Sequence, residues 1–554
     1  MSQIGVLPWR LSACVAASLL AACGGGDKNL AALNPAAAQQ FCEKLASRAD
    51  VPGEVTTVYH APGTRRPGNA ATGDALGGHC VLTGYMDRRT GEDGNSYAIG
   101  YELSLPDNWN GRLLYMGGGG NDGSLRDTSQ SASISGGTPS PLGQGYAVVS
   151  TDAGHQGGLA ASFGFDTQAR IDHAYNAHDK TAQAARQVLA IRYGQQPHHA
   201  YFAGCSGGGR QGMMFSQRFP DYFDGIIAGA PAMRVSSGAT VASMWNHIKF
   251  NAIAPDAPGG GKILSQAFSN GDLDLLADAI LGSCDAADGV ADGLASAVPG
   301  ACNFDPAALQ CAGTKTDSCL TAAQLGALND VFVRGPRNSA DQPLYFGQPW
   351  DPGIRDFGWR IWTLGTSTTA TPNSVYAALM SDALKYEFFT PPDPDFDILT
   401  FDFDTDPLRM EAFSQVYDTY RDTTLATYKA GGGKFMIIHG MADPIFSALE
   451  SRDYYEKLAA NNGGMAAVRD WARAYYVPGM THCSGGRATD TFDAIQAMVD
   501  WVEKGVAPDR IQAWARPTNA YFPDRTRPLC PYPQYARYDG AGGVEDAASF
   551  VCVN

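Results

Sequence analysis

The chain has 554 residues, of which 44% are hydrophobic and 17% are charged, so it is a globular protein with a sizeable core and not a disordered one. Its length suggests about three to four domains, an upper figure because large α/β enzymes often carry one long insertion. The formal net charge of −16 argues against nucleic acid as a partner, since phosphate binding requires a basic surface.

The N-terminal segment is typical of an export signal. The apolar run at 11–20 is too short to span a bilayer but suits the core of a signal peptide. It leads into 20–23 (LAAC), which resembles the lipobox of a bacterial lipoprotein, whose Cys is lipid-modified. We therefore predict a lipoprotein-type signal peptide at 1–22 and an exported protein, either periplasmic or anchored to the outer membrane through Cys23. An ordinary signal peptide, with Cys23 incidental and the protein secreted, is the alternative.

The cysteine content also indicates export. Of the 12 cysteines in the chain, Cys14 and Cys23 belong to the signal region and ten remain. An even number of cysteines in an exported chain indicates disulfides, with buried thiols as the alternative. No CxxC pair with matching His spacing is present, so we expect no zinc site.

The first large segment, from about residue 37 to 232, alternates short apolar runs with amphipathic stretches. The pattern predicts strands at 112–116, 145–150, 199–204 and 225–228, and helices at 172–193 and 208–219. Strands that alternate with helices form a largely parallel sheet that is covered on both faces. We therefore expect an α/β domain.

The alternation fades between about residues 233 and 428, a stretch rich in Asp, Ala, Thr and Pro. It returns with predicted strands at 434–439 and 474–477 and a helix at 490–504. The simplest interpretation is one α/β domain, made of residues 37–232 and 429–554, that is split by an inserted domain at 233–428.

A G-x-S-x-G motif stands at Gly204–Gly208 (GCSGG). In this motif a strand turns sharply into a helix and exposes the Ser side chain, and the flanking residues are small because strand and helix approach closely. The motif alone is a weak signal, because the chain contains 65 glycines and a chance match is easily found. Its position between a predicted strand and a predicted helix favours Ser206 as a nucleophile.

Two further residues follow predicted strands in the chain order of an α/β-hydrolase triad. Asp443 comes one short loop after the strand at 434–439, and His482 comes after the strand at 474–477. Each has an ordinary alternative, a turn-forming Asp before a Pro and a surface His. Taken together, the order predicts that His482 takes the proton from Ser206 while Asp443 orients the imidazole.

Backbone amides would bind the oxyanion that such a reaction forms. One N–H belongs to Gly207, directly after the nucleophile, and we assign the other to Gly120 in the glycine run 117–120. A flexible loop is the alternative for this run, but its position after the predicted strand at 112–116 favours the oxyanion role.

Two cysteines adjoin the predicted triad. Cys205 precedes Ser206, and Cys483 follows His482. If the triad forms, the two cysteines are brought together, so we favour a disulfide between them over separate thiols or other pairings.

These motifs resemble the tannase and feruloyl esterase family. The resemblance is carried by Cys205–Arg210 (CSGGGR), the later Asp443 and the pair His482–Cys483. It extends over nearly the whole mature chain through SQRFP (216–220), DGIIAGAP (224–231), FDFDTDPL (401–408), IIHGMAD (437–443), VPGMTHCSGG (477–486) and RTRPLCPYPQ (525–534). Within the family, these phrases look most like the member that hydrolyses a terephthalate monoester.

The resemblance implies an α/β-hydrolase fold with a large inserted lid domain, in which residues 233–428 form a lid over the active site. It also implies disulfides between sequence-neighbouring cysteines, beside Cys205–Cys483. These are Cys42–Cys80, Cys284–Cys302, Cys311–Cys319 and Cys530–Cys552.

The family is known to bind calcium in a lid loop, which corresponds to residues 284–294 here. The implied ligands are the carboxylates of Asp285, Asp288 and Asp292 and the backbone carbonyls of Val290 and Leu294. The residues alone favour a solvated acidic loop, because the spacing differs from that of an EF-hand. Since no ligand belongs to the triad, we expect a structural Ca²⁺, and we expect no organic cofactor.

The resemblance also places Trp350, Leu379 and Phe446 in the wall of an aromatic-acyl pocket, with ordinary core packing as the alternative. These residues are apolar, as a pocket for an aromatic ring requires.

The free carboxylate of the terephthalate monoester is bound in the family by an Arg at the lid position that is Val375 here, with Met380 and Ala383 nearby. This difference predicts that a neutral aromatic ester suits the chain better than the monoester. Arg355 or Arg360 could supply the missing charge instead.

We therefore predict a secreted serine esterase that hydrolyses aromatic carboxylic esters, such as terephthalate, hydroxycinnamate or gallate esters, through an acyl-enzyme. One alternative is an acyltransferase with the same triad, which product analysis with an alcohol acceptor would reveal. The other is a non-catalytic, calcium-binding surface lipoprotein, which Ser206→Ala would test. The expected partner is a small aromatic ester. If Cys23 is acylated, the protein would also be anchored to a membrane. We expect a monomer.

Overall fold

A computed structural model of the chain describes residues 34–64, 76–132, 134, 139–295 and 297–554. The predicted signal peptide at 1–22 and Cys23 lie outside these residues. Within the described part of the chain, no helix is both long and apolar enough to cross a membrane.

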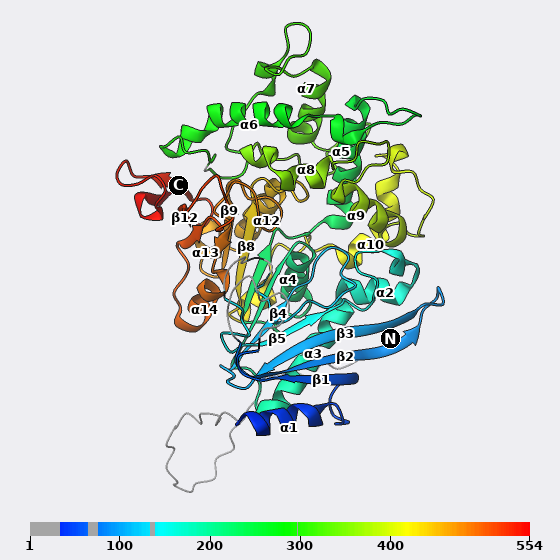
Figure 1. The fold of residues 1–554 in the computed structure, drawn as a ribbon, viewed down its shortest axis with the longest axis vertical. Coiled ribbons are helices and arrows are strands. Elements are labelled where there is room, and N and C mark those ends of the chain that lie inside the picture. Colours follow the sequence, from blue (N-terminus) through cyan, green and yellow to red (C-terminus); the bar gives the residue numbers. More distant parts are fainter. Residues whose placement is uncertain (1–33, 65–75, 133, 135–138, 296) are drawn as a thin grey trace.

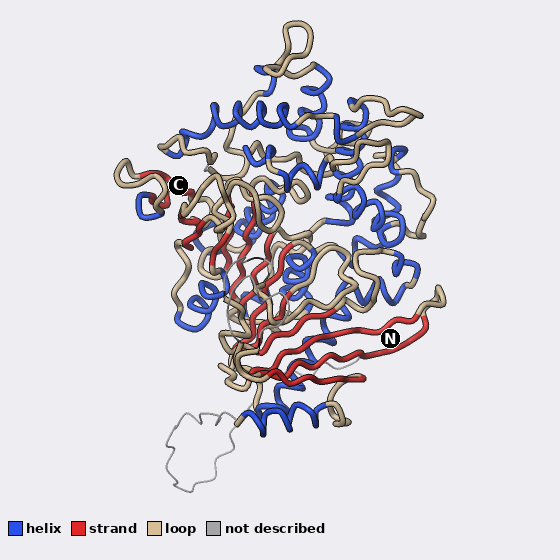
Figure 2. Tube along the Cα trace, viewed as in Figure 1, coloured by secondary structure: helices blue, strands red, loops and turns tan. Residues whose placement is uncertain are grey.

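The centre of the molecule is a nine-stranded sheet with the order β1-β2-β3-β5-β4-β6-β7-β8-β9 (Figures 1 and 2). Its strands are β1 Glu54–His60, β2 His79–Thr90, β3 Ser96–Pro106, β4 Arg112–Met116, β5 Ala147–Thr151, β6 His199–Cys205, β7 Gly225–Gly229, β8 Lys434–Gly440 and β9 Ala472–Val477. The first three strands and the β3–β5 pair are antiparallel. Every pair from β5 across to β9 is parallel, so the carboxyl ends of these strands meet at one edge of the sheet.

The remaining strands lie near the C-terminus and form two small antiparallel sheets. They are β10 Thr491–Phe492, β11 Ile511–Trp514, β12 Thr526–Leu529, β13 Tyr535–Tyr538 and β14 Phe550–Val553. The helices are α1 Pro35–Leu45, α2 Thr167–Ile171, α3 Ala177–Tyr193, α4 Gly207–Arg218, α5 Thr240–Ile253, α6 Asn270–Cys284, α7 Ala322–Leu328, α8 Phe357–Thr363, α9 Val375–Ala383, α10 Asp406–Tyr417, α11 Ala426–Ala430, α12 Ala448–Asn461, α13 Met465–Val468 and α14 Ala494–Lys504.

Helices cover both faces of the central sheet because successive side chains of a strand point to opposite faces. In β4, Leu113 and Tyr115 belong to the core cluster that contains residues of α3, α4 and α12. Leu114 and Met116 belong instead to the cluster that contains residues of α14. Burial on both faces explains why these strands are nearly continuous apolar runs, and the arrangement confirms the predicted α/β class.

Most predicted elements of the sheet are present within a residue or two of the expected bounds, and β4 has the bounds that were predicted. One correction concerns the helix expected at 490–504, which begins only at Ala494. Thr491 and Phe492 pair with β11 and are therefore extended, and Asp493 accepts a hydrogen bond from the Gln496 backbone N–H as the helix cap. The helix expected at 172–193 starts with a π-helical turn, Asp172–Asn176, before α3.

The chain between β7 and β8 is helical and lies at one end of the sheet, where Figure 1 shows it in green to yellow. It contains α5 to α11, and its apolar residues form two core clusters, one of which also includes Ile445 and Phe446 from the loop after β8. We call residues 233–428 the lid segment below; that it closes over a substrate stays a prediction. The end predicted at residue 428 falls inside α11, Ala426–Ala430.

Five disulfides join the ten cysteines of the described chain. The pairs are Cys42–Cys80, Cys205–Cys483, Cys284–Cys302, Cys311–Cys319 and Cys530–Cys552, which are the pairs that the sequence and its resemblance predicted. Disulfides persist in oxidising compartments, so their number supports an exported protein.

Candidate active site

Ser206 occupies the sharp turn between β6 and α4. Its backbone has φ of 66° and ψ of −123°, a conformation that a non-glycine residue adopts only when its surroundings enforce it. Two hydrogen bonds do so here: the N–H of Ser206 donates to the carbonyl of Gly229 at 3.0 Å, and its carbonyl accepts from Ala232 N–H at 3.1 Å. The turn therefore holds the side chain at the carboxyl end of the sheet.

Small residues around Ser206 allow strand and helix to approach. A Cβ on Gly204 would lie 2.8 Å from backbone atoms of Gly208, and a Cβ on Gly208 would lie 2.8 Å from the carbonyl oxygen of Gly118. Real Cβ atoms do not sit that close to backbone, so larger residues would push β6, α4 and the 117–120 loop apart. The spacing of the G-x-S-x-G motif is thus explained by packing around Ser206.

His482 is oriented by Asp443. The Nδ1 atom of the imidazole lies 2.8 Å from Oδ2 of the carboxylate. Asp443 follows β8, and His482 lies in the loop after β9, so neighbouring parallel strands deliver both residues to the same edge of the sheet. The Oδ1 atom of Asp443 accepts the N–H groups of Ile445 and Phe446 at 2.8 and 3.2 Å, which fixes the carboxylate.

Asp443 remains ionised although its side chain is fully buried. Burial alone would raise the pKa of this carboxyl, but its attraction to His482 and the hydrogen bonds from His439 and His482 outweigh that effect and hold the pKa well below its usual range. His439 has its Nε2 atom 3.4 Å from Oδ2 and is itself held by Ser451. A buried, ionised carboxylate accepts the Nδ1–H of the imidazole and thereby fixes the tautomer in which Nε2 is free to accept a proton.

Ser206 and His482 line the same cavity, whose volume is about 310 Å³. Most of its wall is apolar and comes from both the sheet domain and the lid segment: Leu159, Ala232, Val235, Trp362, Val375, Leu379, Met380, Phe388, Ile445 and Phe446. The rings of Trp362 and Phe446 stand edge-on to His482, with centroids 5.3 and 5.5 Å away. A cavity of this kind suits a flat, apolar acyl group.

Gly120 and Gly207 also line this cavity, and their backbones are adjacent: a Cβ on Gly207 would lie 3.1 Å from the carbonyl oxygen of Gly120. The N–H groups of Gly117, Gly118 and Gly119 donate to Ala203, Gln211 and Asp122, respectively. No acceptor for the N–H of Gly120 or Gly207 is found in the described part of the chain, and the first N–H groups of a helix have no partner within it. These two amides are therefore available to an oxyanion.

The disulfide Cys205–Cys483 joins the turn that holds Ser206 to the loop that holds His482. The two Cα atoms are 5.9 Å apart, and both cysteines line the cavity. The bond therefore limits how far Ser206 and His482 can separate.

The predicted substrate-wall residues are only partly brought to the cavity. Leu379 and Phe446 line it, but Trp350 does not. Trp350 is 7% exposed and stacks on Phe332, with ring centroids 4.5 Å apart, inside the core of the lid segment. The lid tryptophan at the cavity is Trp362, at the end of α8, which the sequence reasoning missed.

The lid position at which the family carries an Arg is apolar here as expected. Val375 and Met380 line the cavity, whereas Ala383 does not. Neither proposed substitute supplies a charge: Arg355 pairs with Asp278 at 2.6 Å, and Arg360 donates to backbone carbonyls of the lid segment.

Arg210 of the CSGGGR motif has a structural role that the sequence did not reveal. Its fully buried guanidinium donates to the carbonyls of His173, Ala174 and Tyr417, and it lies over the ring of Tyr417 at 3.9 Å. Because Tyr417 lines the cavity at the end of α10, Arg210 connects α4 to the lid segment.

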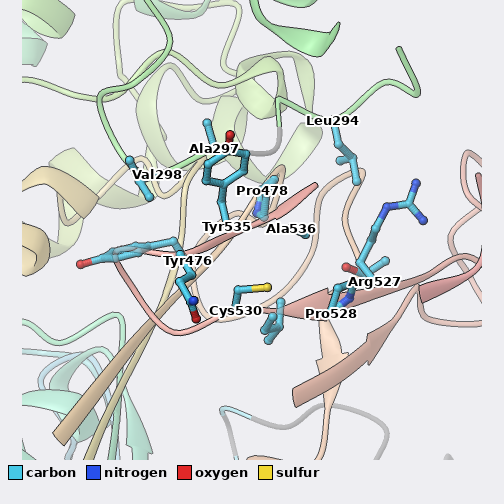
Figure 3. Close-up of a pocket in the computed structure, with 13 residues that line it drawn as sticks. Leu294, Ala297, Val298, Tyr476, Pro478, Arg527, Pro528, Cys530, Tyr535 and Ala536 are labelled. Atoms are coloured by element: carbon cyan, nitrogen blue, oxygen red, sulfur yellow. The ribbon is translucent and has the colours of Figure 1, made fainter. Parts of the chain in front are cut away.

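A second, smaller cavity of about 30 Å³ lies between lid residues and the C-terminal strands (Figure 3). Leu294 and Val298 line it on one side, and Tyr476 and Cys530 line it on the other. This volume is about that of one water molecule, so the cavity is too small for a substrate.

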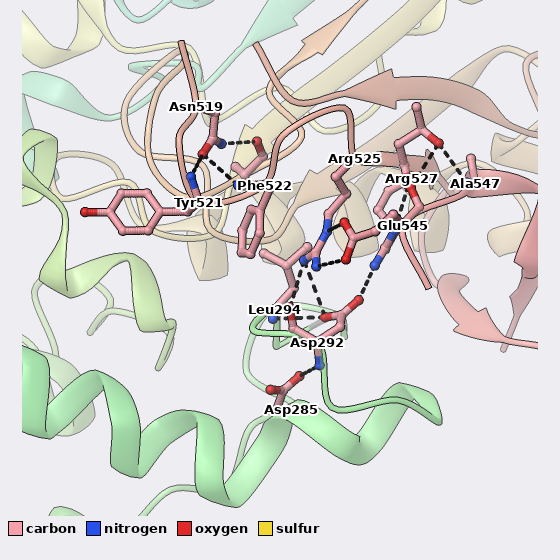
Figure 4. A network of polar contacts seen from close by, with 12 residues as sticks. Asp285, Asp292, Leu294, Asn519, Tyr521, Phe522, Arg525, Arg527, Glu545 and Ala547 are labelled. Atoms are coloured by element: carbon pink, nitrogen blue, oxygen red, sulfur yellow. Dashed lines mark hydrogen bonds and ion pairs between the residues drawn. The ribbon is translucent and has the colours of Figure 1, made fainter. Parts of the chain in front are cut away.

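The predicted calcium loop packs against the C-terminal segment (Figure 4). Asp285 begins a short 3-10 turn, and its two oxygens accept the backbone N–H groups of Asp292 and Gly293, both at 2.9 Å. The side chain of Asp292 is 1% exposed and forms ion pairs with Arg525 and Arg527.

This donor set fits calcium in its chemistry, because it contains only carboxylate and carbonyl oxygens in one short loop. The side chains are not converged on one point, and no group of three or more His, Cys, Asp or Glu in the described residues is placed to hold a metal. Binding by Asp285, Asp288 and Asp292 would therefore require Asp285 to exchange its backbone partners for the ion.

Comparison with known proteins gives consistent matches. The profile described as "Tannase and feruloyl esterase" matches residues 80–553. The mono(2-hydroxyethyl) terephthalate hydrolase of Piscinibacter sakaiensis is 40% identical over 568 residues, which cover 94% of this chain and 92% of that protein. A probable feruloyl esterase B-1 of Aspergillus oryzae is 29% identical and covers 82% of this chain and 80% of its own length.

Solved structures agree with these matches. The crystal structure of feruloyl esterase B from Aspergillus oryzae has a TM-score of 0.76 at 26% identity and covers 93% of this chain and 100% of its own. The tannin acyl hydrolase from Aspergillus niger, at 23% identity and a TM-score of 0.67, shares the fold. These likenesses confirm the predicted α/β-hydrolase fold.

Proposed function

The chain belongs to the tannase and feruloyl esterase family and is therefore a carboxylic ester hydrolase, and from this premise we propose that it cleaves esters of aromatic carboxylic acids through Ser206, His482 and Asp443. The observation that carries the proposal is the 2.8 Å hydrogen bond between Asp443 and His482 at the wall of a cavity that Ser206 also lines. Relatives named as terephthalate, feruloyl and tannin ester hydrolases support an aromatic acyl group.

The chemistry follows from the positions of these groups. His482, its Nδ1–H held by Asp443, accepts the Ser206 proton at Nε2 while the Ser oxygen attacks the ester carbonyl. The amides of Gly120 and Gly207 donate to the oxyanion of the tetrahedral intermediate. The imidazolium then gives its proton to the leaving alcohol, which leaves an acyl-enzyme. A water molecule, activated by His482 in the same way, releases the aromatic acid.

The cavity supports the substrate class by its size and lining. A volume of about 310 Å³ bounded by Trp362, Leu379 and Phe446 accommodates a benzoyl or cinnamoyl group. The lid segment supplies Trp362 and Leu379, so part of the specificity lies outside the sheet domain.

Two further properties belong to the proposal. The loop of Asp285, Asp288 and Asp292 would hold a structural Ca²⁺, which its all-oxygen donor set supports. The protein would be exported, which its five disulfides support, and Cys23 would be the point of lipid attachment.

Hydrolysis of a small ester panel tests the function. The panel contains methyl ferulate, a gallate ester, and the mono- and diesters of terephthalate with ethylene glycol, with products separated by chromatography. We expect turnover of at least one ester and a loss of about 10³-fold or more in Ser206→Ala. Ser216→Ala, which removes a buried hydroxyl from the same helix, is the matched control and should keep the rate.

Two outcomes would contradict the proposal. Turnover that survives in Ser206→Ala would place the nucleophile elsewhere, and no turnover of any ester by folded protein would leave the aromatic substrate class without support. Adding methanol to the reaction distinguishes hydrolysis from acyl transfer, because an acyltransferase would give the methyl ester as its main product.

A further inference from the structure

Arg126 is the only residue with a permanent charge among those that line the catalytic cavity, all of which the structure describes. The remaining lining residues are apolar side chains, glycines and a few neutral polar groups, apart from His482, and none is an Asp or Glu. A single fixed cation in a mainly apolar cavity is costly unless something anionic meets it, because burial removes part of its hydration.

The guanidinium of Arg126 is little used by the protein itself. Its Nη2 atom donates to the carbonyl of Gly118 at 3.2 Å. No carboxylate within the described residues comes within ion-pair distance of it; Asp122 is affected by its charge only through space. By contrast, Arg355 forms an ion pair with Asp278, and Arg210 and Arg360 each donate to more than one backbone carbonyl. Arg126 therefore retains N–H donors for a ligand, since a guanidinium carries five.

Arg126 lies close to Gly120, whose N–H we assign to the oxyanion. A Cβ placed on Gly119 would lie 3.2 Å from Nη2 of Arg126, so the guanidinium lies against the residue that precedes Gly120. The part of the wall that α9 supplies, with Val375, Leu379 and Met380, is apolar. Any anionic group of a bound ester would therefore be attracted to the Arg126 side of the cavity, where the surrounding apolar wall strengthens a charged hydrogen bond.

We propose that Arg126 is a specificity-determining residue that binds a carboxylate carried by the ester substrate. The inference rests on the proposed esterase function and names its substrate class: monoanionic esters of aromatic acids. It replaces the expectation, drawn from Val375 alone, that a neutral ester suits the chain better. The charge that is missing from the lid helix is supplied from the loop that contains Gly120.

The test compares mono(2-hydroxyethyl) terephthalate with its methyl ester, in which the carboxylate is masked as a neutral ester. Only the release of ethylene glycol is scored, because the methyl ester has a second bond that can be cleaved. The readout is the ratio of kcat/KM for the anionic ester to kcat/KM for the neutral one. In Arg126→Gln, which keeps an N–H donor for Gly118 but has no charge, we expect the ratio to fall by about tenfold or more. Arg126→Lys should keep a ratio within a few-fold of the parent, because it keeps the charge.

The control is Arg88→Gln, which removes one positive charge from an exposed position on β2 that does not line the cavity. It should leave the ratio unchanged. If Arg126→Gln lowers kcat/KM for both esters equally, Arg126 only supports the glycine loop and the inference is wrong. An unchanged ratio would also overturn it. A parent enzyme that hydrolyses methyl ferulate or the gallate ester but not the anionic monoester would overturn the inference alone. If the parent hydrolyses no ester of the panel, or Ser206→Ala hydrolyses them as the parent does, it is the proposed function that fails.

Discussion

The disulfide between Cys205 and Cys483 joins the residue that precedes Ser206 to the residue that follows His482, and it does so across 278 positions of the chain. The bond holds together two loops that come from different halves of the sheet domain. Its main effect should therefore be on the geometry of catalysis.

We expect the double variant Cys205→Ala/Cys483→Ala to lose kcat by about tenfold or more, because the serine and the imidazole are no longer held together. It should also lose about 2–5 kcal/mol of unfolding free energy, as expected for a bond that closes a long loop. Steady-state kinetics and denaturant unfolding measure the two effects. The control is Cys311→Ala/Cys319→Ala, which opens a loop of 8 positions away from the cavity and should keep kcat. Equal kinetic losses in both pairs would show that the active-site disulfide has no special role.

Asp443→Asn should lower kcat by about 10³–10⁴-fold with little change in KM. The amide can still accept the N–H groups of Ile445 and Phe446 through Oδ1, but it offers no charge to the imidazolium and favours the wrong tautomer of His482. Rates measured with the best ester of the panel test this.

Asp272→Asn is a suitable control for Asp443→Asn, because Asp272 is also a buried carboxylate, 6% exposed, and accepts the N–H of Ser269 in the capping box of α6 in the lid segment. Its kcat should stay within a few-fold of the parent. Retention of most activity by Asp443→Asn would mean that another group orients the histidine.

The sequence predicted the parallel part of the sheet well because those strands are buried on both faces. Arg112–Met116 and Lys434–Gly440 each contain four consecutive apolar residues, 113–116 and 435–438, which a local pattern reveals. The antiparallel strands β1 to β3 were missed. In β1, exposed residues largely alternate with half-buried ones, so the segment lacks the apolar run that marks a central strand. Its extended conformation depends on pairing with β2.

The placement of Ser206, Asp443 and His482 at one edge of the sheet was predictable because their order along the chain follows from the fold, whereas the cavity wall was not. Trp359 and Trp362 are three residues apart on α8, and only packing decides that the first is buried in the lid core while the second faces the substrate space. Arg126 lies in no motif. Its side chain lies close to Gly119 because of the way the loop after β4 folds back, and a local sequence pattern does not predict that path.

Breaking the buried pair of His173 and Glu387 should loosen the lid segment. Nδ1 of His173 lies 2.6 Å from Oε1 of Glu387, and the two side chains are 1% and 0% exposed. Glu387 precedes Phe388, which lines the cavity. We expect Glu387→Ala to cost about 3–5 kcal/mol in unfolding free energy, because it leaves a polar group buried without its partner, and to raise KM.

An exposed pair provides the comparison for Glu387→Ala. Lys457 and Asp453 lie one turn apart on α12, 2.7 Å from each other at the surface. Asp453→Ala should cost less than about 1 kcal/mol. A similar cost for both variants in chemical unfolding would argue against a special contribution of the buried pair.

Removal of calcium should lower stability and leave the active site intact. If the loop of Asp285 and Asp292 binds Ca²⁺, a hundredfold excess of the ion over its dissociation constant stabilises the protein by about 2.7 kcal/mol. We therefore expect a higher Tm in calcium than in chelator, and no difference in Asp285→Asn. Asp274→Asn, an exposed position on α6, should behave like the parent. Thermal unfolding and metal analysis of the purified protein test this; no bound calcium and equal Tm values would contradict the calcium proposal.

The pH dependence of stability should change in Asp152→Asn. Asp152 follows β5 and is buried, and burial raises its pKa to about 7 despite hydrogen bonds from the N–H groups of Gly100 and Gly154 and from Gln156. The pKa in the unfolded chain is about 3.9. The folded state thus binds the proton more tightly, and the stability that this contributes is complete below about pH 4 and is lost as the pH rises to about 7.

Asparagine is always neutral, so Asp152→Asn should flatten the fall in stability between about pH 4 and 7 and be the more stable protein at pH 8, by on the order of 2 kcal/mol. Urea unfolding at several pH values measures this. Asp166→Asn should behave in the opposite way, because the ion pair with Arg89 outweighs burial and holds the pKa of Asp166 below its usual range. It should lose stability at every pH above about 4, where the unfolded carboxyl is ionised. If the unfolding free energies of the parent and Asp152→Asn change with pH in the same way, this carboxyl is ionised in the folded protein at neutral pH.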